Sequence, residues 1–572
     1  RVIRLCSKAK KRHYVSRVKS LKKDNPAKWH HSLRKILNSG RSSVSIRLPD
    51  NAHLHDEDIA ELVNSHFSSI VNELPRLDLA SLPSYLPSPS RPPRIFPWEV
   101  YETLRRLNPN KSNGPDNLPP RIVKQYAAEF SDVLTHIFNS SLEEGYIPKQ
   151  WKQAVITPIP KKSPASLDNL RPISLTSVLI KAFESFVTKW VLQDMANVLD
   201  PNQFGCRKRI STVHYLTAMV NSILLGAETP KSIQTILLTD FSKAFDRINH
   251  TTLINKMLQY GVRTSILPWL CNFLSNRLQC VRYNGITSNW KDISCGVPQG
   301  TKLGPILFLI YINDALSEDV LDRYKFVDDL SVCESRMFYQ PSLIQTSLDK
   351  LNSWASKNDM ILHGEKCKLL MISFMRDCPL PPEISLNNTS LEYTETARIL
   401  GLWFSHDLSW GKHVDIITQK ASSRLFWLKK LKRFGLPIQD LLEFYQGYIR
   451  PTLEYAAPVW SPSITAQQSM KVERIQKRAL RIILGPQYIS YNEALTLLCL
   501  PSLENRRKNL SLRFAKSLLR NPTFRSWLPP TRSDIHARNL KGAHQLCIPL
   551  AKTNRYKNSP IPYFTHLLNT YT

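Results

Sequence analysis

The sequence predicts an α+β fold that carries a basic segment at each end. Hydrophobic residues make up 42% of the 572-residue chain, which is enough to bury the cores of roughly two to four domains. Short β-prone runs alternate with helical patterns through its middle part, as is typical of mixed folds. The formal net charge of +31 is concentrated at the two ends.

This uneven charge bears on the kind of partner. Residues 1–49 hold 15 Lys and Arg against one acid, and residues 501–572 hold 13 against two. Two basic ends around a nearly neutral body predict a polyanion partner, most simply a nucleic acid. Solvated tails are the alternative interpretation.

Membrane and secretory classes are disfavoured. The longest central apolar run, Ile306 to Ile312, is far shorter than the roughly 20 residues that span a bilayer. Ten scattered cysteines form no C-x-x-C pair, and no secretory signal opens the sequence. We therefore expect a reduced, intracellular protein without membrane contact.

Composition divides the chain into segments. Residues 1–82 form a basic N-terminal region, and regular apolar breaks from Arg1 to about Arg47 are compatible with amphipathic helices. Residues 83–97 are so rich in Pro and Ser that they cannot pack a core, which predicts a linker. A second domain begins after it, and residues 501–572 form a basic C-terminal extension.

Strands and helices alternate after the linker. Helical apolar spacing covers Tyr126 to Leu142 and Lys243 to Tyr260, and each pattern ends near a glycine. Gln234 to Leu238 is a short, buried strand. The segment from Leu278 to Cys295 is interrupted by Asn284-Gly285, which predicts a hairpin.

The next elements complete the mixed region. Leu303 to Leu316 is predicted to be a buried helix, and Asp322 to Cys333 forms two short strands that meet at Asp328-Asp329. Strand patterns stop at about residue 411, where helical patterns begin. The sequence thus predicts an α+β region over 98–410 and a helical region over 411–500.

Three carboxylates are the candidate chemical groups. Asp328 and Asp329 occupy a turn between two strands, and Asp240 closely follows the strand candidate that contains Leu238. If these strands are neighbours, the three acids converge, although turns also carry Asp for backbone reasons alone. Clustered carboxylates repel unless a divalent cation neutralises them, and Mg²⁺ prefers oxygen ligands. Such a cluster can hold two metal ions about 3.5–4 Å apart.

A glycine-rich loop lies between these acids in the sequence, at residues 295–305. Gly296, Gly300 and Gly304 let the backbone approach a ligand closely, while Pro298 and Pro305 fix the loop and start the next helix. The loop alone is a weak signal, but its place between the acids makes it specific.

Five ordered blocks follow one another along the chain: Asn110–Asp116, Leu170–Ser174, Thr239–Asp246, Gly296–Gly300 and Phe326–Asp329. They resemble those of reverse transcriptases, and most closely those of non-LTR (LINE-type, Jockey-like) retrotransposons. Further blocks continue the resemblance, which covers roughly residues 98–490. These are Gly364–Lys366, Ile399–Gly401, Leu453–Ala456, Pro458–Trp460 and Gln476–Arg481.

The resemblance implies a right-hand polymerase with fingers and palm over 98–410 and a helical thumb over 411–500. Asp240, Asp328 and Asp329 match the catalytic, metal-binding triad, with Asp240 and Asp328 as the direct ligands. Two Mg²⁺ ions would be the cofactors, with Mn²⁺ as the alternative ion.

The resemblance also implies a nucleotide site. Its residues would be Arg171, Phe245, Gln299, Gly300, Lys161 and Lys366. Phe245 would exclude a ribose 2′-hydroxyl, unless its ring faces away from the site and belongs to the core. A surface lysine is the alternative interpretation of Lys366. Val327, Lys302 and Cys206 depart from the family's usual residues without removing a catalytic group.

The implied function is RNA-directed DNA synthesis by two-metal nucleotidyl transfer. Its partners would be an RNA template, a DNA primer or nicked target DNA, and dNTP. We expect nuclear action and an endonuclease domain upstream of residue 1. One alternative is an RNA-dependent RNA polymerase, against which Phe245 argues. The other is a degenerate, catalytically inactive mobile-element remnant that binds nucleic acid.

Overall fold

The computed structural model describes residues 54–78, 82, 90–161, 165–535 and 542–571, with a few isolated positions before residue 17. The prediction of amphipathic helices within residues 1–49 falls outside the described residues, as does the first half of the predicted linker. Within the described part, helices and strands interleave as far as β14 (Leu402–Ser405), and only helices and turns form the elements that follow. This confirms the predicted α+β class.

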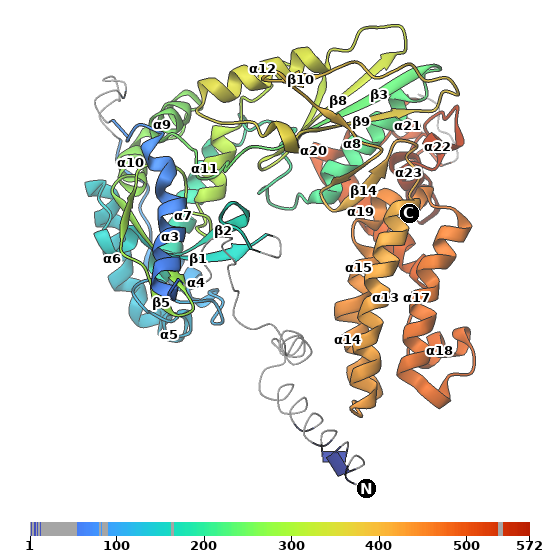
Figure 1. Ribbon diagram of the computed structural model, residues 1–572, viewed down its shortest axis with the longest axis horizontal. Helices are drawn as coiled ribbons and strands as arrows, with labels where there is room; N and C mark the ends of the chain where they lie inside the picture. The colour runs from blue at the N-terminus through green and yellow to red at the C-terminus, as the bar shows by residue number, and fades with distance from the viewer. Residues whose placement is uncertain are drawn as a thin grey trace.

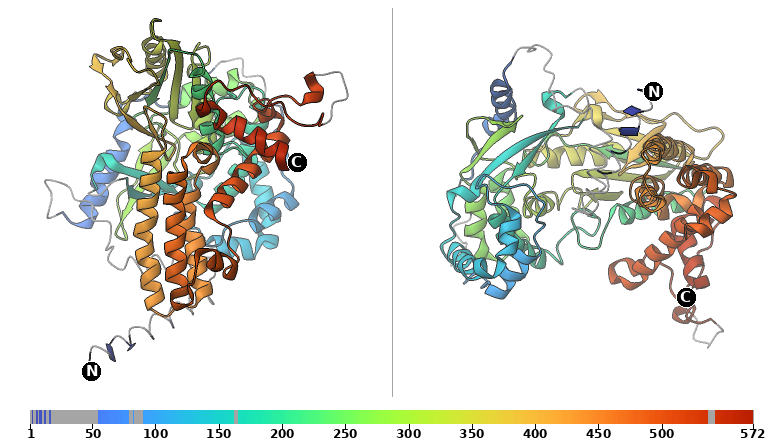
Figure 2. Two further views of the ribbon diagram at one scale, coloured as in Figure 1. Left: turned by 90° about the vertical axis from the view of Figure 1, so that its right-hand side faces the viewer. Right: turned by 90° about the horizontal axis from the view of Figure 1, so that it is seen from below.

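Figures 1 and 2 show an arch in which a strand-rich top joins two limbs. The sheet at the top has the strand order β12-β9-β3-β8-β7. Its strands are β3 (Ser232–Thr239), β7 (Asp322–Phe326), β8 (Asp329–Met337), β9 (Lys368–Ser373) and β12 (Glu392–Tyr393). We call this the central sheet.

Successive residues of β3 pack into two different hydrophobic cores. Leu237 packs into a core shared with the helices of the first limb, and Ile236 packs into a core shared with the helices of the second. Successive side chains of a strand point to opposite faces. Because both faces of β3 are covered, its apolar run has no alternation with polar residues, as the sequence predicted for a buried strand.

The first limb contains a second sheet. Its strands are β1 (Gln153–Pro160), β2 (Leu170–Leu175), β4 (Arg277–Tyr283), β5 (Ile286–Thr287) and β6 (Lys291–Ile293). The predicted hairpin is present: Asn284 and Gly285 both adopt positive φ between β4 and β5, as a tight two-residue turn requires.

Helices cover these sheets. Those of the first limb and its approach to the central sheet are α4 (Pro97–Arg105), α5 (Pro120–Gln125), α6 (Ala127–Glu144), α7 (Val178–Asp194), α9 (His250–Gln259), α10 (Leu267–Leu274) and α11 (Gly304–Tyr311). Those that pack directly on the central sheet are α8 (Thr212–Gly226) and α12 (Ile344–Lys357).

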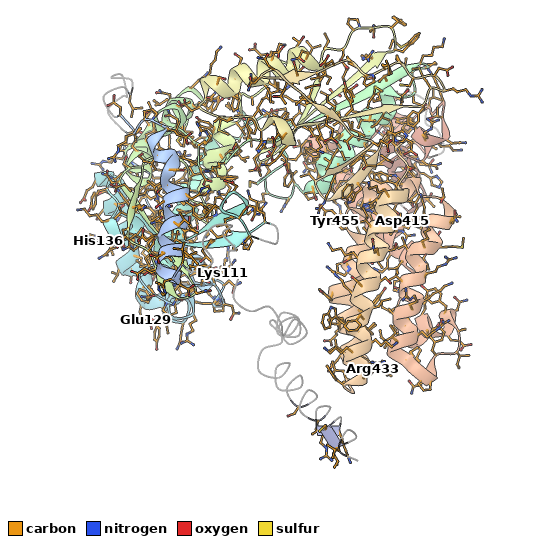
Figure 3. The ribbon with its side chains drawn as sticks, in the orientation of Figure 1. Lys111, Glu129, His136, Asp415, Arg433 and Tyr455 are labelled. Carbon is orange, nitrogen blue, oxygen red and sulfur yellow. The ribbon has the colours of Figure 1, made fainter. Side chains whose placement is uncertain are left out.

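The second limb is helical. Its long helices α13 (Gly411–Arg433) and α17 (Ala466–Leu484) lie side by side, and Figure 3 shows α13 running away from the sheet from Asp415 to Arg433. The remaining helices are α14 (Ile438–Phe444), α15 (Arg450–Glu454), α16 (Ala457–Trp460), α18 (Tyr491–Leu497), α19 (Leu503–Arg520), α20 (Pro522–Arg525), α21 (Arg532–Ile535), α22 (Asn554–Lys557) and α23 (Pro560–Tyr571). A short hairpin of β13 (Thr396–Ile399) and β14 leads into this limb.

The segment before the predicted linker packs on the first limb. Helix α3 (Asp56–Ser68) lies against β4, β5 and β6. The Asn64 amide donates hydrogen bonds to Ser288 Oγ at 3.0 Å and to Asn289 O at 2.9 Å. Ala60 and Val63 are buried against Val281 and neighbouring apolar residues. This contact could not be predicted from the sequence.

Two predicted helices are longer than the observed ones. The helix expected from Lys243 begins only at His250. Lys243 adopts a positive φ of 49°, which is not helical, and Asn249 caps the helix because its Oδ1 accepts a hydrogen bond from Thr252 N at 3.2 Å. The helix expected over Leu303 to Leu316 ends at Tyr311. Composition alone does not encode these turns.

No helix in the described part of the chain combines the length and apolar character that crossing a bilayer requires.

Candidate active site

The site is built around the hairpin of β7 and β8. Phe326 pairs with Asp329, so Val327 and Asp328 form a two-residue turn. Val327 adopts a φ of 62°, a conformation that is costly for a β-branched residue. The buried Gln203 side chain holds the turn, since its Oε1 accepts hydrogen bonds from Val327 N at 3.0 Å and Gly205 N at 2.8 Å. The strained turn is therefore fixed by a neighbouring loop.

Strand register brings the third acid to the same place. Thr239 at the end of β3 pairs with Leu330 of β8, so Asp240 follows at the end of the sheet where Asp329 stands. The Asp240 carbonyl accepts a hydrogen bond from His363 N at 2.8 Å, which fixes its backbone. The predicted convergence of Asp240, Asp328 and Asp329 is thus present at the end of two paired strands.

The electrostatics of the acids show that they repel one another. Burial and the charges of Asp328 and Asp240 raise the pKa of Asp329 to about 6. The pKa of Asp328 is also raised, mainly by burial and further by the charge of Asp240, while the Arg171 guanidinium opposes the shift. A positive charge placed among these carboxylates would relieve the repulsion.

Lys366 supplies one such charge. Its Nζ lies 3.1 Å from Asp240 Oδ2, and both side chains remain partly exposed. Within the described residues, no three His, Cys, Asp or Glu side chains are arranged as a ready metal site. The ammonium group therefore neutralises Asp240, and the carboxylate oxygens of the three acids are donors of the kind that hard divalent ions prefer.

Two further cations face the acids from the first limb. Arg171 lies on β2, paired with Ile159 of β1, and Lys161 directly follows β1. Partial burial lowers the pKa of Lys161; the charges of Arg171 and Lys366 add to the shift, and Asp240 opposes it. All of these groups therefore share one electrostatic environment.

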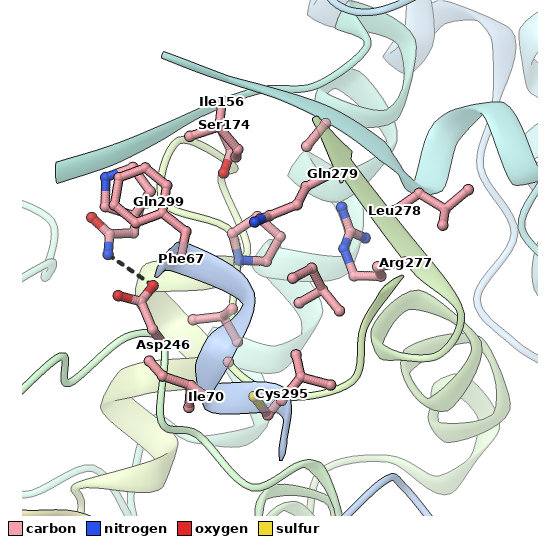
Figure 4. Close-up of a pocket in the computed structure, with 17 residues that line it drawn as sticks. Phe67, Ile70, Ile156, Ser174, Asp246, Arg277, Leu278, Gln279, Cys295 and Gln299 are labelled. Atoms are coloured by element: carbon pink, nitrogen blue, oxygen red, sulfur yellow. Dashed lines mark hydrogen bonds between the residues drawn. The ribbon is translucent and has the colours of Figure 1, made fainter. Parts of the chain in front are cut away.

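The glycine-rich loop passes beneath this region. The side-chain amide of Gln299 donates a hydrogen bond to Asp246 Oδ1 at 3.1 Å (Figure 4). The main-chain carbonyl of Gln299 accepts a hydrogen bond from Ser174 N at 2.7 Å. Gly300 has a φ of 134°, and a Cβ there would lie 2.6 Å from Ser174 O. Only glycine fits so close an approach to strand β2.

Comparison with known proteins identifies this region. Residues 159–404 match the family model described as reverse transcriptase (RNA-dependent DNA polymerase). The chain is 29% identical over 448 residues to the RNA-directed DNA polymerase from mobile element jockey of Drosophila melanogaster, covering 74% of this chain and 48% of that protein. It is 27% identical over 443 residues to the jockey polymerase of Drosophila funebris, again covering 74% and 48%.

Residues 159–404 form a reverse transcriptase domain. The chain is also 27% identical over 416 residues to the probable RNA-directed DNA polymerase from transposon X-element of Drosophila melanogaster, covering 70% of this chain and 45% of that protein. These relatives belong to non-LTR retrotransposons. The chain spans about half the length of the curated relatives it matches.

Glu184, a buried acid of the reverse transcriptase domain, was not predicted from the sequence. Glu184 of α7 accepts hydrogen bonds from Lys302 N at 2.6 Å and Leu303 N at 3.0 Å, so it anchors the end of the glycine-rich loop. Burial raises the pKa of Glu184, and the hydrogen bonds and the Arg277 charge oppose the shift. A single acid between Phe183 and Phe186 in an apolar helix was the available signal.

Phe245 lies at the junction of the loop and α11 in the same domain. Its ring stacks on Phe308 with centroids 4.6 Å apart, and its carbonyl accepts from Val297 N at 2.9 Å. The ring remains partly exposed. One face is therefore fixed by the core, which leaves the other face able to contact a ligand.

A cavity of about 440 Å³ adjoins the acids of the reverse transcriptase domain. Asp240, Asp329 and Lys366 line one side, and the β13–β14 hairpin with Leu400 and Trp403 lines the other. The cavity therefore lies between the carboxylates and the hairpin that leads into the second limb.

Proposed function

We propose that this chain is an RNA-directed DNA polymerase that copies retrotransposon RNA into DNA. The observation that carries the proposal is the convergence of Asp240, Asp328 and Asp329 opposite Arg171 and Lys161, within a domain homologous to the jockey polymerase. Its partners would be an RNA template, a DNA primer or nicked target DNA in the nucleus, and dNTP. In this proposal the first limb supplies the fingers, the central sheet the palm and the second limb the thumb.

The three acids would hold two divalent metal ions, Mg²⁺ or Mn²⁺. The hard oxygen donors support this assignment, and so does the burial that, together with the mutual repulsion of the acids, raises the pKa values of Asp328 and Asp329. Metal ions bound there would activate the primer 3′-hydroxyl and neutralise charge on the leaving pyrophosphate. Lys366 would exchange its contact with Asp240 for a phosphate oxygen when the ions bind.

The remaining residues would bind and orient the nucleotide. Arg171, with its planar fork of donors, and Lys161 would hold the triphosphate. Gln299 and Gly300 would support the base pair from below. Asp246 holds the side chain of Gln299, and Ser174 N holds its main-chain carbonyl. Phe245 would stand beside the ribose and exclude a 2′-hydroxyl.

One assay tests the proposal. We expect the full chain to add dNTP to a DNA primer on an RNA template in a reaction that requires a divalent cation, and Asp328→Asn to abolish it. Asp349→Asn, which changes an exposed acid of α12, is the matched control. Activity of Asp328→Asn within a few-fold of the parent would contradict the site. No incorporation by the parent, with nucleic-acid binding retained, would support the degenerate remnant instead.

A further inference from the structure

A group of cations lies outside the proposed catalytic site, on the last turns of α19. Arg513, Lys516 and Arg520 are spaced three and four residues apart, so they share one face of the helix. Together with Arg209, which precedes α8, they line a hollow of about 460 Å³. We call this the α19 hollow. Figure 1 shows α19 and α20 beside α8.

The cations of the α19 hollow have no acidic partner. In the described part of the chain, no carboxylate oxygen lies within 4.0 Å of these four groups, and no acid lines the hollow. The first turns of the same helix differ: Arg506 pairs with Glu454, and Arg507 is buried and donates to Ser469 Oγ at 2.7 Å. One end of α19 is thus anchored in the core, and the other presents unpaired charge.

An aromatic floor fixes the positions of these cations. His214 packs against Phe514 and Phe524, with ring centroids 4.9 and 4.6 Å away. Burial lowers the pKa of His214 to about 4, so the ring is neutral near pH 7. Phe514 lies on α19, so its contact with His214 positions the helix. The neutral His214 ring adds no charge of its own to the hollow.

The loop that carries Arg209 also reaches the catalytic turn. Gln203 hydrogen-bonds Val327 N at 3.0 Å, next to Asp328. Burial raises the pKa of the Cys206 thiol, and the charge of Asp328 adds to this shift. Arg209 lies six positions after Gln203, a length of chain that spans at most about 22 Å. One extended strand of nucleic acid can therefore contact both places.

We propose that the α19 hollow binds the phosphodiester backbone of the nucleic acid strand whose neighbouring part occupies the polymerase site. This second contact rests on the proposed function. The three helix cations extend over about 10 Å of helix, a length that faces about three phosphates of one strand. Apart from the His214 ring, which is buried against Phe514 and Phe524, the lining offers guanidinium, ammonium and small polar groups and no Phe, Tyr or Trp on which a base could stack. Recognition is therefore of the backbone and independent of sequence.

Equilibrium binding without dNTP or divalent metal tests this inference. The probes are fluorescent primer–templates of fixed duplex length with single-stranded overhangs of increasing length, in RNA and in DNA. Arg513→Gln/Lys516→Gln/Arg520→Gln is compared with Arg105→Gln/Arg121→Gln/Lys149→Gln, which removes the same charge from exposed positions of the first limb.

With long overhangs we expect the α19 variant to bind roughly 10- to 50-fold more weakly near 0.15 M salt, and its salt slope to fall by about two units. The control variant should change neither quantity comparably. The nucleic acid whose overhang produces the loss, RNA or DNA, identifies the source of the backbone.

Equal salt slopes for the α19 variant and the control would overturn the inference. Arg513→Gln/Arg520→Gln, which changes only exposed residues, provides a second variant if the triple substitution unfolds. Because no catalytic step is measured, a chain that fails to polymerise would contradict the proposed function without affecting this comparison.

Discussion

Acidification should weaken the reverse transcriptase domain through His250. This residue, at the start of α9, is 1% exposed, and its Nε2 lies 2.7 Å from Gly296 O. The carbonyl can only accept, so Nε2 carries the proton. Within the described residues Nδ1 has no hydrogen-bond partner. Burial lowers the pKa of His250 to about 4; the bond to Gly296 opposes this shift and the Arg277 charge adds to it.

The magnitude follows from the difference between the two states. In the unfolded chain the ring has its usual pKa of 6.5, so between pH 6.5 and 4 the unfolded state binds more protons than the folded state. Stability is therefore complete above pH 6.5 and is lost as the pH falls toward 4. Lowering the pH from 7.5 to 5 should reduce the free energy of unfolding by about 2 kcal/mol through His250 alone.

His250→Gln isolates this contribution. The glutamine amide can still donate to Gly296 O but does not titrate. Thermal unfolding at pH 7.5 and pH 5 is compared for the parent, His250→Gln and His136→Gln, a matched change of an exposed histidine on α6 (Figure 3). Buried His214 and His413, whose pKa values are also lowered to about 4, act equally in all three proteins.

On acidification, we expect the midpoint of His250→Gln to fall less than that of the parent. The difference should be roughly 4–8 °C for a cooperative unit of 150–250 residues. The His136→Gln variant should follow the parent. If His250→Gln loses as much stability as the parent, protonation of His250 does not oppose folding.

Two further substitutions probe the loop and the sugar. Phe245→Ala should increase rNTP incorporation relative to dNTP, because it opens the space beside the ribose while Phe308 keeps its place; unchanged discrimination in a variant that polymerises would make Phe245 a packing residue. Gly296→Ala should lower the melting temperature and dNTP incorporation, since its φ is 72° and a Cβ would lie 2.7 Å from Asp246 O. Gly261→Ala, at a φ of 76° with nothing within 4 Å, should cost only the conformational part, about 1–2 kcal/mol. Equal losses would contradict the clash.

The strands that carry the acids could be predicted from the sequence because their signal is local. One apolar run ends just before Asp240, and two others flank Asp328-Asp329. Pairing of these strands therefore brings the three carboxylates together. The anchors of the site could not be predicted in this way. Glu184 bonds to residues 118 and 119 positions later, and Gln203 to a residue 124 positions later. Bonds across such separations leave no periodicity in the sequence.

The same limit applies to the backbone. Lys243 and Val327 adopt positive φ values that neither residue type favours, and only the surrounding fold imposes them. The predicted helix start at Lys243 was therefore wrong. The predicted turn at Asp328-Asp329 lies one residue earlier, at Val327-Asp328, because Asp329 already pairs with Phe326 as the first residue of β8.

The anchors have one property in common. Gln203 and Glu184 accept hydrogen bonds from backbone N–H groups, and His250 donates one to a backbone carbonyl. Each comes from an element distant in the sequence from the turn or loop that it holds. The positions of Asp328 and of the glycine-rich loop therefore depend on how α7, α9 and the loop before α8 pack around the central sheet. A substitution in those elements can displace the carboxylates without touching them, since a turn strained at Val327 keeps its conformation only while Gln203 satisfies its backbone.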